Sequence, residues 1–188
     1  MKLLHLDSSI TGDGSVSRQL TATIVDRLRA AHPGLEISYR DLAADPIAHL
    51  TLGLMPASSP DSRALLDQFL ASDVVVIGAP MYNFTLPSQL KAWLDRVLIA
   101  GETFSYGPEG PQGLAGGKRV IIALSRGGLY SAGSPAAAFE HTETSLRAVF
   151  GFIGITPEFV VAEGVMMGPE GRASAIDTAS AEIDRLAA

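Results

Sequence analysis

The stretch DVVVIGAPMYNF, residues 73–84, decides the fold class and also points to a binding surface. Val74–Ile77 is an unbroken β-branched run, which is typical of a strand buried on both faces of a parallel sheet. Gly78 and Pro80 end the strand. Met81–Phe84 then supplies three bulky side chains and one amide, where a plain connection would more often carry small polar residues. This composition indicates either a surface for a planar ligand or an aromatic cover over the end of the core, with equal weight.

Length and composition limit the class of protein. The 188 residues fit a single domain over 1–188, and 47% of them are hydrophobic, which is enough for a substantial core. The absence of cysteine excludes disulfides and thiolate metal sites. A net charge of −6 without a Lys/Arg cluster argues against nucleic acid as a partner. No apolar run reaches membrane-spanning length, and Asp7 comes too early for a signal peptide, so we expect a soluble, cytoplasmic protein.

Strand and helix patterns alternate along the chain. This order predicts an α/β fold with a parallel sheet and helices on both faces, and five strands fit the flavodoxin-like order 2-1-3-4-5. The segment 41–60 is irregular, and the Gly-rich segment 101–117 is predicted to be an excursion or hairpin. The predicted strands are 2–6, 35–40, 73–77, 118–124 and 155–162. The predicted helices are 15–31, 61–70, 88–100, 136–152 and 169–186.

In such sheets, ligands bind outside the carboxyl ends of the strands, between the first and third strands. We therefore expect the loops after the first, third and fourth strands to meet. The first of these loops runs into a helix N-terminus, where free amides and the helix dipole favour phosphate. It lacks the lysine of a Walker P-loop. A single N-capping serine is the structural alternative, but this loop carries five hydroxyls: Ser8, Ser9, Thr11, Ser15 and Ser17.

The same loop is one residue short of a dinucleotide-binding motif. Gly12 and Gly14 match the first two glycines of G-x-G-x-x-G, but Ser17 replaces the third. Asp41, at the end of the second predicted strand, is the candidate acid for a ribose. Tight NAD binding at this loop is therefore a minority alternative.

The loop after the fourth predicted strand reads Ser125-Arg126-Gly127-Gly128. Paired glycines let a ring approach the backbone, although an ordinary turn would also use them. The four histidines show no metal-ligand spacing, and no catalytic triad can be assembled, so we expect neither a metal nor a catalytic side chain. The three loops together match a ligand with a monophosphate, a linker and a planar heteroaromatic ring, and FMN is the natural candidate.

These motifs resemble the FMN-dependent NADH-azoreductase / NAD(P)H:quinone oxidoreductase family, which has a flavodoxin-like fold. The similarity extends over nearly the whole chain. The Met-Tyr-Asn-Phe and Arg-Gly-Gly motifs, in this order, are its most specific part. The segments that carry it are Ser9 with Ser15-Val16-Ser17, Pro80–Phe84, Leu90-Lys91-Ala92, Ser125–Gly128 and Gly151–Ile155.

The resemblance implies a role for three sets of residues. The FMN phosphate would be bound by Ser9, Ser15, Val16 and Ser17. The isoalloxazine would be enclosed by Pro80, Met81, Tyr82, Asn83, Phe84, Ser125, Arg126, Gly127 and Gly128. The family is homodimeric with sites at the subunit interface, so some aromatic residues of the substrate pocket would come from the partner. The candidates are Tyr106, Tyr130, Phe150 and Phe152.

The resemblance also implies a ping-pong reaction with one FMN per subunit. NADH or NADPH would give hydride to FMN and leave, and a quinone or aromatic azo compound would then take two electrons at the same place. Other functions stay open. One is a flavin reductase serving nitroaromatics or iron. A flavodoxin-type electron carrier would be more acidic and monomeric, without the 101–117 excursion. A regulatory NAD-binding module would use Gly12 and Gly14.

Overall fold

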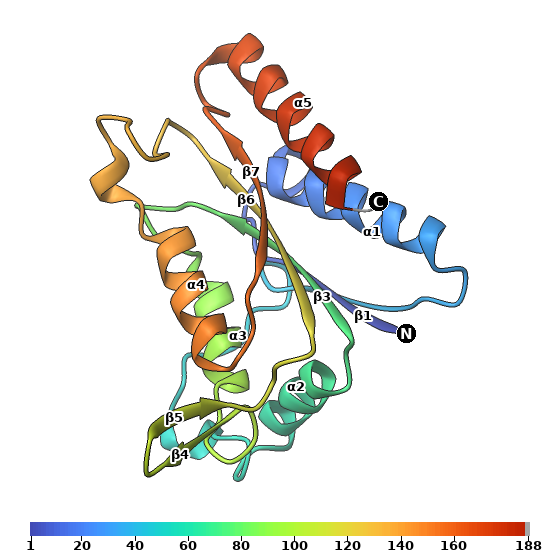
Figure 1. The fold of residues 1–188 in the computed structure, drawn as a ribbon, viewed down its shortest axis with the longest axis vertical. Helices are drawn as coiled ribbons and strands as arrows, with labels where there is room; N and C mark the ends of the chain where they lie inside the picture. The colour runs from blue at the N-terminus through green and yellow to red at the C-terminus, as the bar shows by residue number, and fades with distance from the viewer. Residues whose placement is uncertain (187–188) are drawn as a thin grey trace.

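A five-stranded parallel sheet forms the centre of the protein, as the computed structural model shows for residues 1–186 (Figure 1). The strand order is β2-β1-β3-β6-β7, which confirms the predicted flavodoxin-like order. β3 is buried along its whole length because it lies in the middle of the sheet. The strands are β1 (Lys2–Asp7), β2 (Glu36–Asp41), β3 (Val74–Pro80), β6 (Arg119–Arg126) and β7 (Glu158–Glu163).

Helices cover both faces of the sheet. Figure 1 shows α1 (Val16–Ala31) and α5 (Gly168–Leu186) on one face. The other face carries α2 (Pro60–Leu70), α3 (Ser88–Val97) and α4 (Thr142–Phe152). Alternate residues of β3 belong to the two cores that result, as the twofold side-chain period of a strand requires. Among the described helices, none is both long and apolar enough to cross a membrane.

The segment 101–117 forms the predicted hairpin. β4 (Phe104–Gly107) pairs antiparallel with β5 (Gly110–Gly113) below the C-terminal ends of α3 and α4 (Figure 1). The Ala115 amide donates to the Ile153 carbonyl, with an N···O distance of 3.0 Å, and fastens the hairpin to the turn after α4. The hairpin therefore lies at the edge of the molecule opposite the loops that follow β1, β3 and β6.

Several predicted boundaries were wrong. β3 continues to Pro80 rather than ending at 77, and α3 ends at Val97 rather than at 100. Helix α4 begins at Thr142 rather than at 136, after a 3-10 turn over Ala137–Phe139. The Glu140 carboxylate accepts the free amides of the first turn, including those of Thr142 and Glu143, and so fixes the start of the helix there. Strand β7 begins at Glu158 rather than at 155, because Pro157 has no amide to donate to a neighbouring strand.

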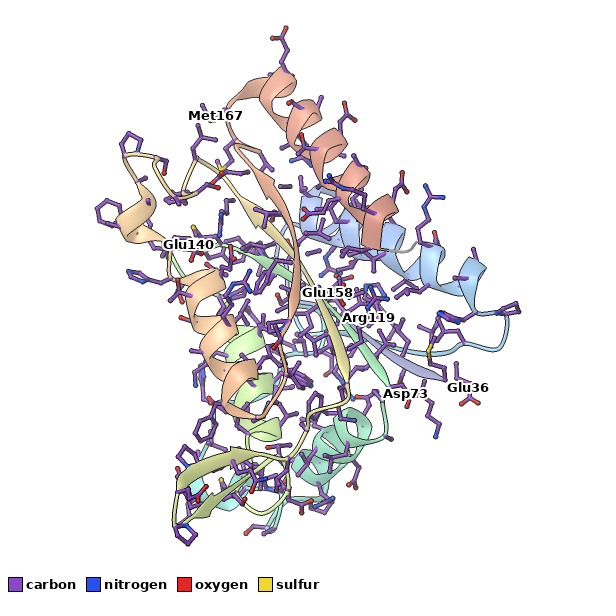
Figure 2. The ribbon with its side chains drawn as sticks, in the orientation of Figure 1. Glu36, Asp73, Arg119, Glu140, Glu158 and Met167 are labelled. Atoms are coloured by element: carbon purple, nitrogen blue, oxygen red, sulfur yellow. The ribbon has the colours of Figure 1, made fainter. Side chains whose placement is uncertain are left out.

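An ion pair joins the beginning of β6 to the beginning of the edge strand β7. Figure 2 shows Arg119 of β6 beside Glu158 of β7, and the two side chains are joined at 2.7 Å between Nε and Oε1. Glu36 and Asp73 mark the same edge of the sheet in this view, whereas Glu140 and Met167 lie toward the opposite edge. This second edge carries the loops that were predicted to meet.

Candidate functional site

The loops after β1, β3 and β6 do meet at the carboxyl edge of the sheet. Ser9 Oγ and the Tyr82 hydroxyl share a hydrogen bond of 3.1 Å, which joins the first loop to the second. The Ile10 amide donates to the same hydroxyl at 3.1 Å. The Met81 amide donates to the Ser125 carbonyl at 2.8 Å and joins the second loop to the end of β6, just before the third loop begins. The expected juxtaposition is therefore confirmed.

The first loop presents buried hydroxyls at the start of α1. Ser15 is the N-cap, since its Oγ accepts the Arg18 amide at 3.2 Å, and it also lies 3.1 Å from Ser17 Oγ. Ser9, Ser15 and Ser17 are all at least 95% buried. The amides of Val16 and Ser17 belong to the first turn, where a helix offers no carbonyl partners of its own. Hydroxyls and amides gathered in this way form a site suited to a phosphate.

The acid considered for a dinucleotide ribose is already engaged. Asp41 accepts two hydrogen bonds from Arg18, both at 2.7 Å, and further ones from the amides of Ala43 and Ala44. The Arg18 hydrogen bonds hold the pKa of Asp41 below its ordinary value, with the two amides adding to the effect against burial. Because the carboxylate is so fully occupied, the structure does not favour the NAD reading of this loop.

Arg18 also stabilises the backbone of the loop after β1. Its Nη2 donates to the Ser9 carbonyl at 2.8 Å, so its guanidinium holds the backbone. A second cation, which sequence analysis missed, comes from α5: Arg172 Nη2 donates to the Gly14 carbonyl at 2.7 Å. No local pattern could have revealed this contact, because Arg172 is 158 residues away in sequence.

The second loop contains a strained two-residue turn. Tyr82 and Thr85 exchange backbone hydrogen bonds of 2.9 and 3.1 Å, and the residues between them, Asn83 and Phe84, have φ angles of +47° and +72°. Positive φ at both central positions defines a type I′ turn, which usually carries Asn-Gly. Phenylalanine is unfavourable there, at a cost of about 1–2 kcal/mol. Strain of this kind is typical of functional sites.

The strained turn directs Phe84 into an aromatic cluster. Its ring lies 6.3 Å from that of Tyr130 and 5.3 Å from that of Phe139, between centroids. The His141 amide donates to the Phe84 carbonyl at 3.0 Å and fixes the turn to the segment before α4. Phe139 was not predicted, because the helical pattern of 136–152 included it. Phe84 and Phe139 are about half exposed, so these three rings form an accessible aromatic wall.

Arg126 lies behind this wall. It is 3% exposed, and its guanidinium is 2.7 Å from Glu143, 3.4 Å from Glu140 and 3.6 Å from Glu163. Glu163 in turn accepts hydrogen bonds from the Tyr130 amide and from Ser131. The Arg126 side chain therefore faces an acidic cluster and secures the loop that carries Tyr130, instead of reaching toward the expected ligand.

The carboxylates around Arg126 are stabilised in their charged form. For Glu140, burial raises the pKa, but the Glu143 and Thr144 amides and the charge of Arg126 outweigh it and bring the pKa below its ordinary value. For Glu163, burial is likewise outweighed, here by the Ser131 hydroxyl, two amides and Arg126, and the pKa is lowered. The ion pairs of this network therefore stabilise the protein at pH values at which Glu140 and Glu163 are both ionised.

Three of the four expected pocket aromatics do not join the aromatic wall of the same chain. Phe150 is fully buried in the core between the sheet and α2–α4, and this burial removes it from the pocket set. Phe152 packs on Phe104 of the hairpin, with centroids 4.7 Å apart, and Tyr106 packs on the same ring. Both lie at the opposite edge from the three loops. Of the four, only Tyr130 lies beside Phe84 in the aromatic wall of this chain.

Comparisons with known proteins agree with this architecture. The sequence model of the flavodoxin-like fold matches residues 1–187. A relative from Methylorubrum populi, an FMN-dependent NADH:quinone oxidoreductase, is 58% identical over 199 residues, covering 96% of this chain and 98% of the relative.

The chain belongs to the family of FMN-dependent NADH:quinone oxidoreductases.

Solved structures of this family share its fold. The crystal structure of an azoreductase from Bacillus anthracis str. Sterne superposes with a TM-score of 0.90 at 29% identity, covering 100% of this chain and 98% of that one. An FMN-dependent NADH-azoreductase from Bacillus anthracis str. Ames Ancestor, in complex with FMN, gives 0.87 at 25% identity, with 100% and 99% covered. The family and the fold inferred from the sequence are therefore confirmed.

The strained turn gives a first prediction for this family member. Phe84→Gly should leave the free energy of unfolding unchanged or raise it by up to about 1 kcal/mol, because relief of the positive-φ strain offsets the lost ring contacts. The same change should raise the KM for quinone several-fold, since it removes the centre of the aromatic wall. Denaturant unfolding and steady-state kinetics measure the two effects. A clear loss of stability would show that the turn carries no strain.

Proposed function

We propose that the chain is an FMN-dependent NADH:quinone oxidoreductase that also reduces aromatic azo compounds. The observation that carries the proposal is the convergence of a serine-rich helix N-terminus and an aromatic-and-amide turn at the switch point of the sheet, in a chain of this family. The named relative and the azoreductase structures support both acceptor classes. We further propose that the chain is a single domain that works in the cytoplasm.

The residues at the three loops fit FMN. Ser9, Ser15 and Ser17, with the Val16 and Ser17 amides, would hold the phosphate. Pro80 to Phe84 and the backbone of Ser125 to Gly128 would enclose the ring system, with the Asn83 amide at its polar edge. Gly127 and Gly128 would let the ring approach the backbone. When bound, FMN supplies the two-electron chemistry between NADH and the acceptor.

The aromatic wall would select planar substrates. Phe84, Tyr130 and Phe139 offer ring faces and edges for a nicotinamide or a quinone, and offset stacking favours such partners. A single aromatic wall accommodates reductant and acceptor in turn, which is the arrangement of a ping-pong reaction. The experiment below separates this proposal from an electron carrier that has no substrate of its own.

We also propose that the protein is a homodimer whose sites use both chains. An apolar groove of about 480 Å³ lies between α3 and α4, lined in part by Leu94, Leu146 and Val149. Its lining matches what a self-associating helix face requires. The position of Tyr106 and Phe152, away from the loops of their own chain, supports a pocket completed by the partner's hairpin.

The dimer yields a second prediction. Ala148→Glu places a charge on the exposed rim of this groove and should convert a particle of twice the chain mass into a monomer, since buried unpaired charge is costly. The rate of quinone reduction should fall when the dimer is lost. Ala22→Glu, on the exposed face of α1, is the matched control and should stay dimeric. Light scattering after gel filtration measures the mass. An unchanged mass for Ala148→Glu would place the interface elsewhere.

Purification followed by anaerobic spectroscopy tests the function. The protein should be yellow, should be bleached by NADH, and should regain its colour with benzoquinone or an azo dye. Protein that stays colourless after reconstitution with FMN would overturn the proposal. Bound flavin that NADH fails to bleach would favour the carrier. Repeating the bleaching with NADPH decides which reductant is preferred.

The phosphate loop yields a third prediction. Ser17→Ala should raise the dissociation constant for FMN about fivefold, because one hydrogen bond to a phosphate is worth about 1 kcal/mol. Ser174→Ala, on the exposed face of α5, is the control and should retain FMN as the parent does. Quenching of flavin fluorescence measures the binding. Equal retention by the two variants would remove Ser17 from the phosphate site.

A further inference from the structure

A second cavity lies outside the candidate flavin site. It has a volume of about 370 Å³ and is bounded by the irregular segment 41–60, by the start of α2 and by the end of α3. Part of its lining is apolar, contributed by Pro46, Ile47, Leu54 and Leu65. A cavity of this size accommodates a small organic molecule.

Arg96 of α3 lines this cavity and is 1% exposed. Its Nε donates to Ser62 Oγ at 3.0 Å, and its Nη2 donates to the Ala48 carbonyl at 2.7 Å. Its Nη1 is buried and has no hydrogen-bond partner in the described part of the chain. No carboxylate of residues 1–186 lies within 4.0 Å of this guanidinium.

This arrangement is unusual for a buried cation. A charge removed from water is normally paired, because its desolvation would otherwise strongly destabilise the fold. The chain follows that rule elsewhere: Arg126, equally buried, faces three carboxylates, and Arg18 is bound by Asp41. Arg96 has neutral partners on two nitrogens and an unused donor on the third. An anion from outside the chain would supply the missing partner of the Arg96 guanidinium.

The other polar groups of the cavity define the anion. The Ser62 hydroxyl, whose oxygen accepts from Arg96, can donate its own proton to the same ligand. Asp45 and Asp61 also line the cavity, and so does a second cation, Arg40, whose Nη1 lies 3.4 Å from Asp45. The two carboxylates balance the two guanidinium groups, so the lining favours a ligand with a single negative charge over a dianion such as a phosphate monoester.

We propose that this cavity binds a small organic monocarboxylate with an apolar body of about six carbons. Its carboxylate would accept from the Ser62 hydroxyl and from Nη1 of Arg96, once a small rotation of the guanidinium turns this buried nitrogen toward the cavity. Its hydrocarbon part would lie against Ile47, Leu54 and Leu65. The site is independent of the proposed flavin chemistry, because none of its residues belongs to the three loops.

Calorimetric titration of the FMN-loaded protein with hexanoate tests the proposal. We expect one site per chain with a dissociation constant below about 1 mM, which is within reach of a ligand of this size. Arg96→Gln should weaken binding at least tenfold. Ala64→Phe, at an exposed position of α2 that lines the cavity, should do the same by filling the space. Arg29→Gln, on the exposed side of α1, is the control and should bind as the parent does.

Any one of the following results would overturn the proposal. Failure of the parent protein to bind hexanoate removes the site, and equal binding of inorganic phosphate removes the assigned ligand class. Loss of hexanoate binding when benzoquinone is added would place the ligand at the flavin instead. If Arg96→Gln does not fold, Ala64→Phe decides, and unchanged hexanoate binding by that variant rejects the cavity. Because the readout is heat and not turnover, failure here leaves the oxidoreductase proposal untouched.

Discussion

Replacing Arg126 by methionine is expected to lower the free energy of unfolding at pH 7 by about 3–5 kcal/mol, the cost of removing one partner from a buried ionic network. Arg126 is 3% exposed and is the cation that faces Glu140, Glu143 and Glu163. Methionine keeps most of the volume and removes the charge, so the carboxylates would repel one another across an apolar side chain. Urea unfolding at pH 7 measures the loss.

The pH dependence separates this charge effect from a packing effect. In the parent protein the pKa values of Glu140 and Glu163 lie below their ordinary value of 4.5, so the stability they contribute is present above that pH and is lost as pH falls through the lowered values. In Arg126→Met the pKa values of both carboxyls should rise, because the groups lose the charge of Arg126 while burial still opposes their ionised form. The stability gap between parent and variant should therefore narrow as pH falls from 7 toward 5.

Arg147→Met provides a matched control. Arg147 also binds Glu143, at 2.7 Å, but its side chain is 50% exposed, and exposed pairs contribute little. We expect a loss below about 1 kcal/mol with no narrowing at low pH. A gap of constant size for Arg126→Met across this pH range would show that volume, and not charge, determines the contribution of the residue. The loop of Tyr130 should also loosen in Arg126→Met, raising the KM for quinone.

The second large effect is expected at the hairpin. A Cβ added at Gly113 would lie 2.6 Å from the Gly154 Cα and closer still to the Gly154 nitrogen. Both are backbone atoms, so no side chain can turn away to make room. We expect Gly113→Ala to displace the hairpin from the turn after α4 and to destabilise the protein by about 3 kcal/mol, the upper part of the range for overpacking.

Gly107→Ala is the control within the same hairpin. The nearest atom to an added Cβ there is the Gly110 carbonyl oxygen at 3.9 Å, which is ordinary contact. Its melting temperature should change by no more than a degree or two, as for a surface substitution. Thermal unfolding of both variants tests the prediction. Equal melting temperatures would mean that β5 can move away from α4 without cost.

The fold was predictable from the sequence because its signals are local. The unbroken β-branched run of 74–77 identifies a central strand, and the alternation of strands and helices then leaves few topologies. The switch-point rule predicted that the loops after β1, β3 and β6 meet, and the Ser9–Tyr82 and Met81–Ser125 hydrogen bonds confirm it.

What could not be predicted depends on contacts between distant segments. The start of α4 is fixed by the Glu140 side chain and by a hydrogen bond to Phe84, and neither has a helical-period signal. Arg126 was assigned to the ligand because of its motif, whereas three glutamates, from α4, the segment before it and β7, direct its side chain inward. The phenylalanine at φ +72° was equally hidden, because sequence preference predicts glycine for such a turn.

The position of the hairpin, at the edge away from the three loops, has a genetic consequence under the proposed dimer. One variant damaged only in its phosphate loop and another damaged only in its hairpin would each be inactive alone. Coexpressed, they would form mixed pairs in which one of the two sites combines an intact loop with an intact hairpin. Random pairing would restore about a quarter of the normal activity. Two defective alleles of this gene would complement each other.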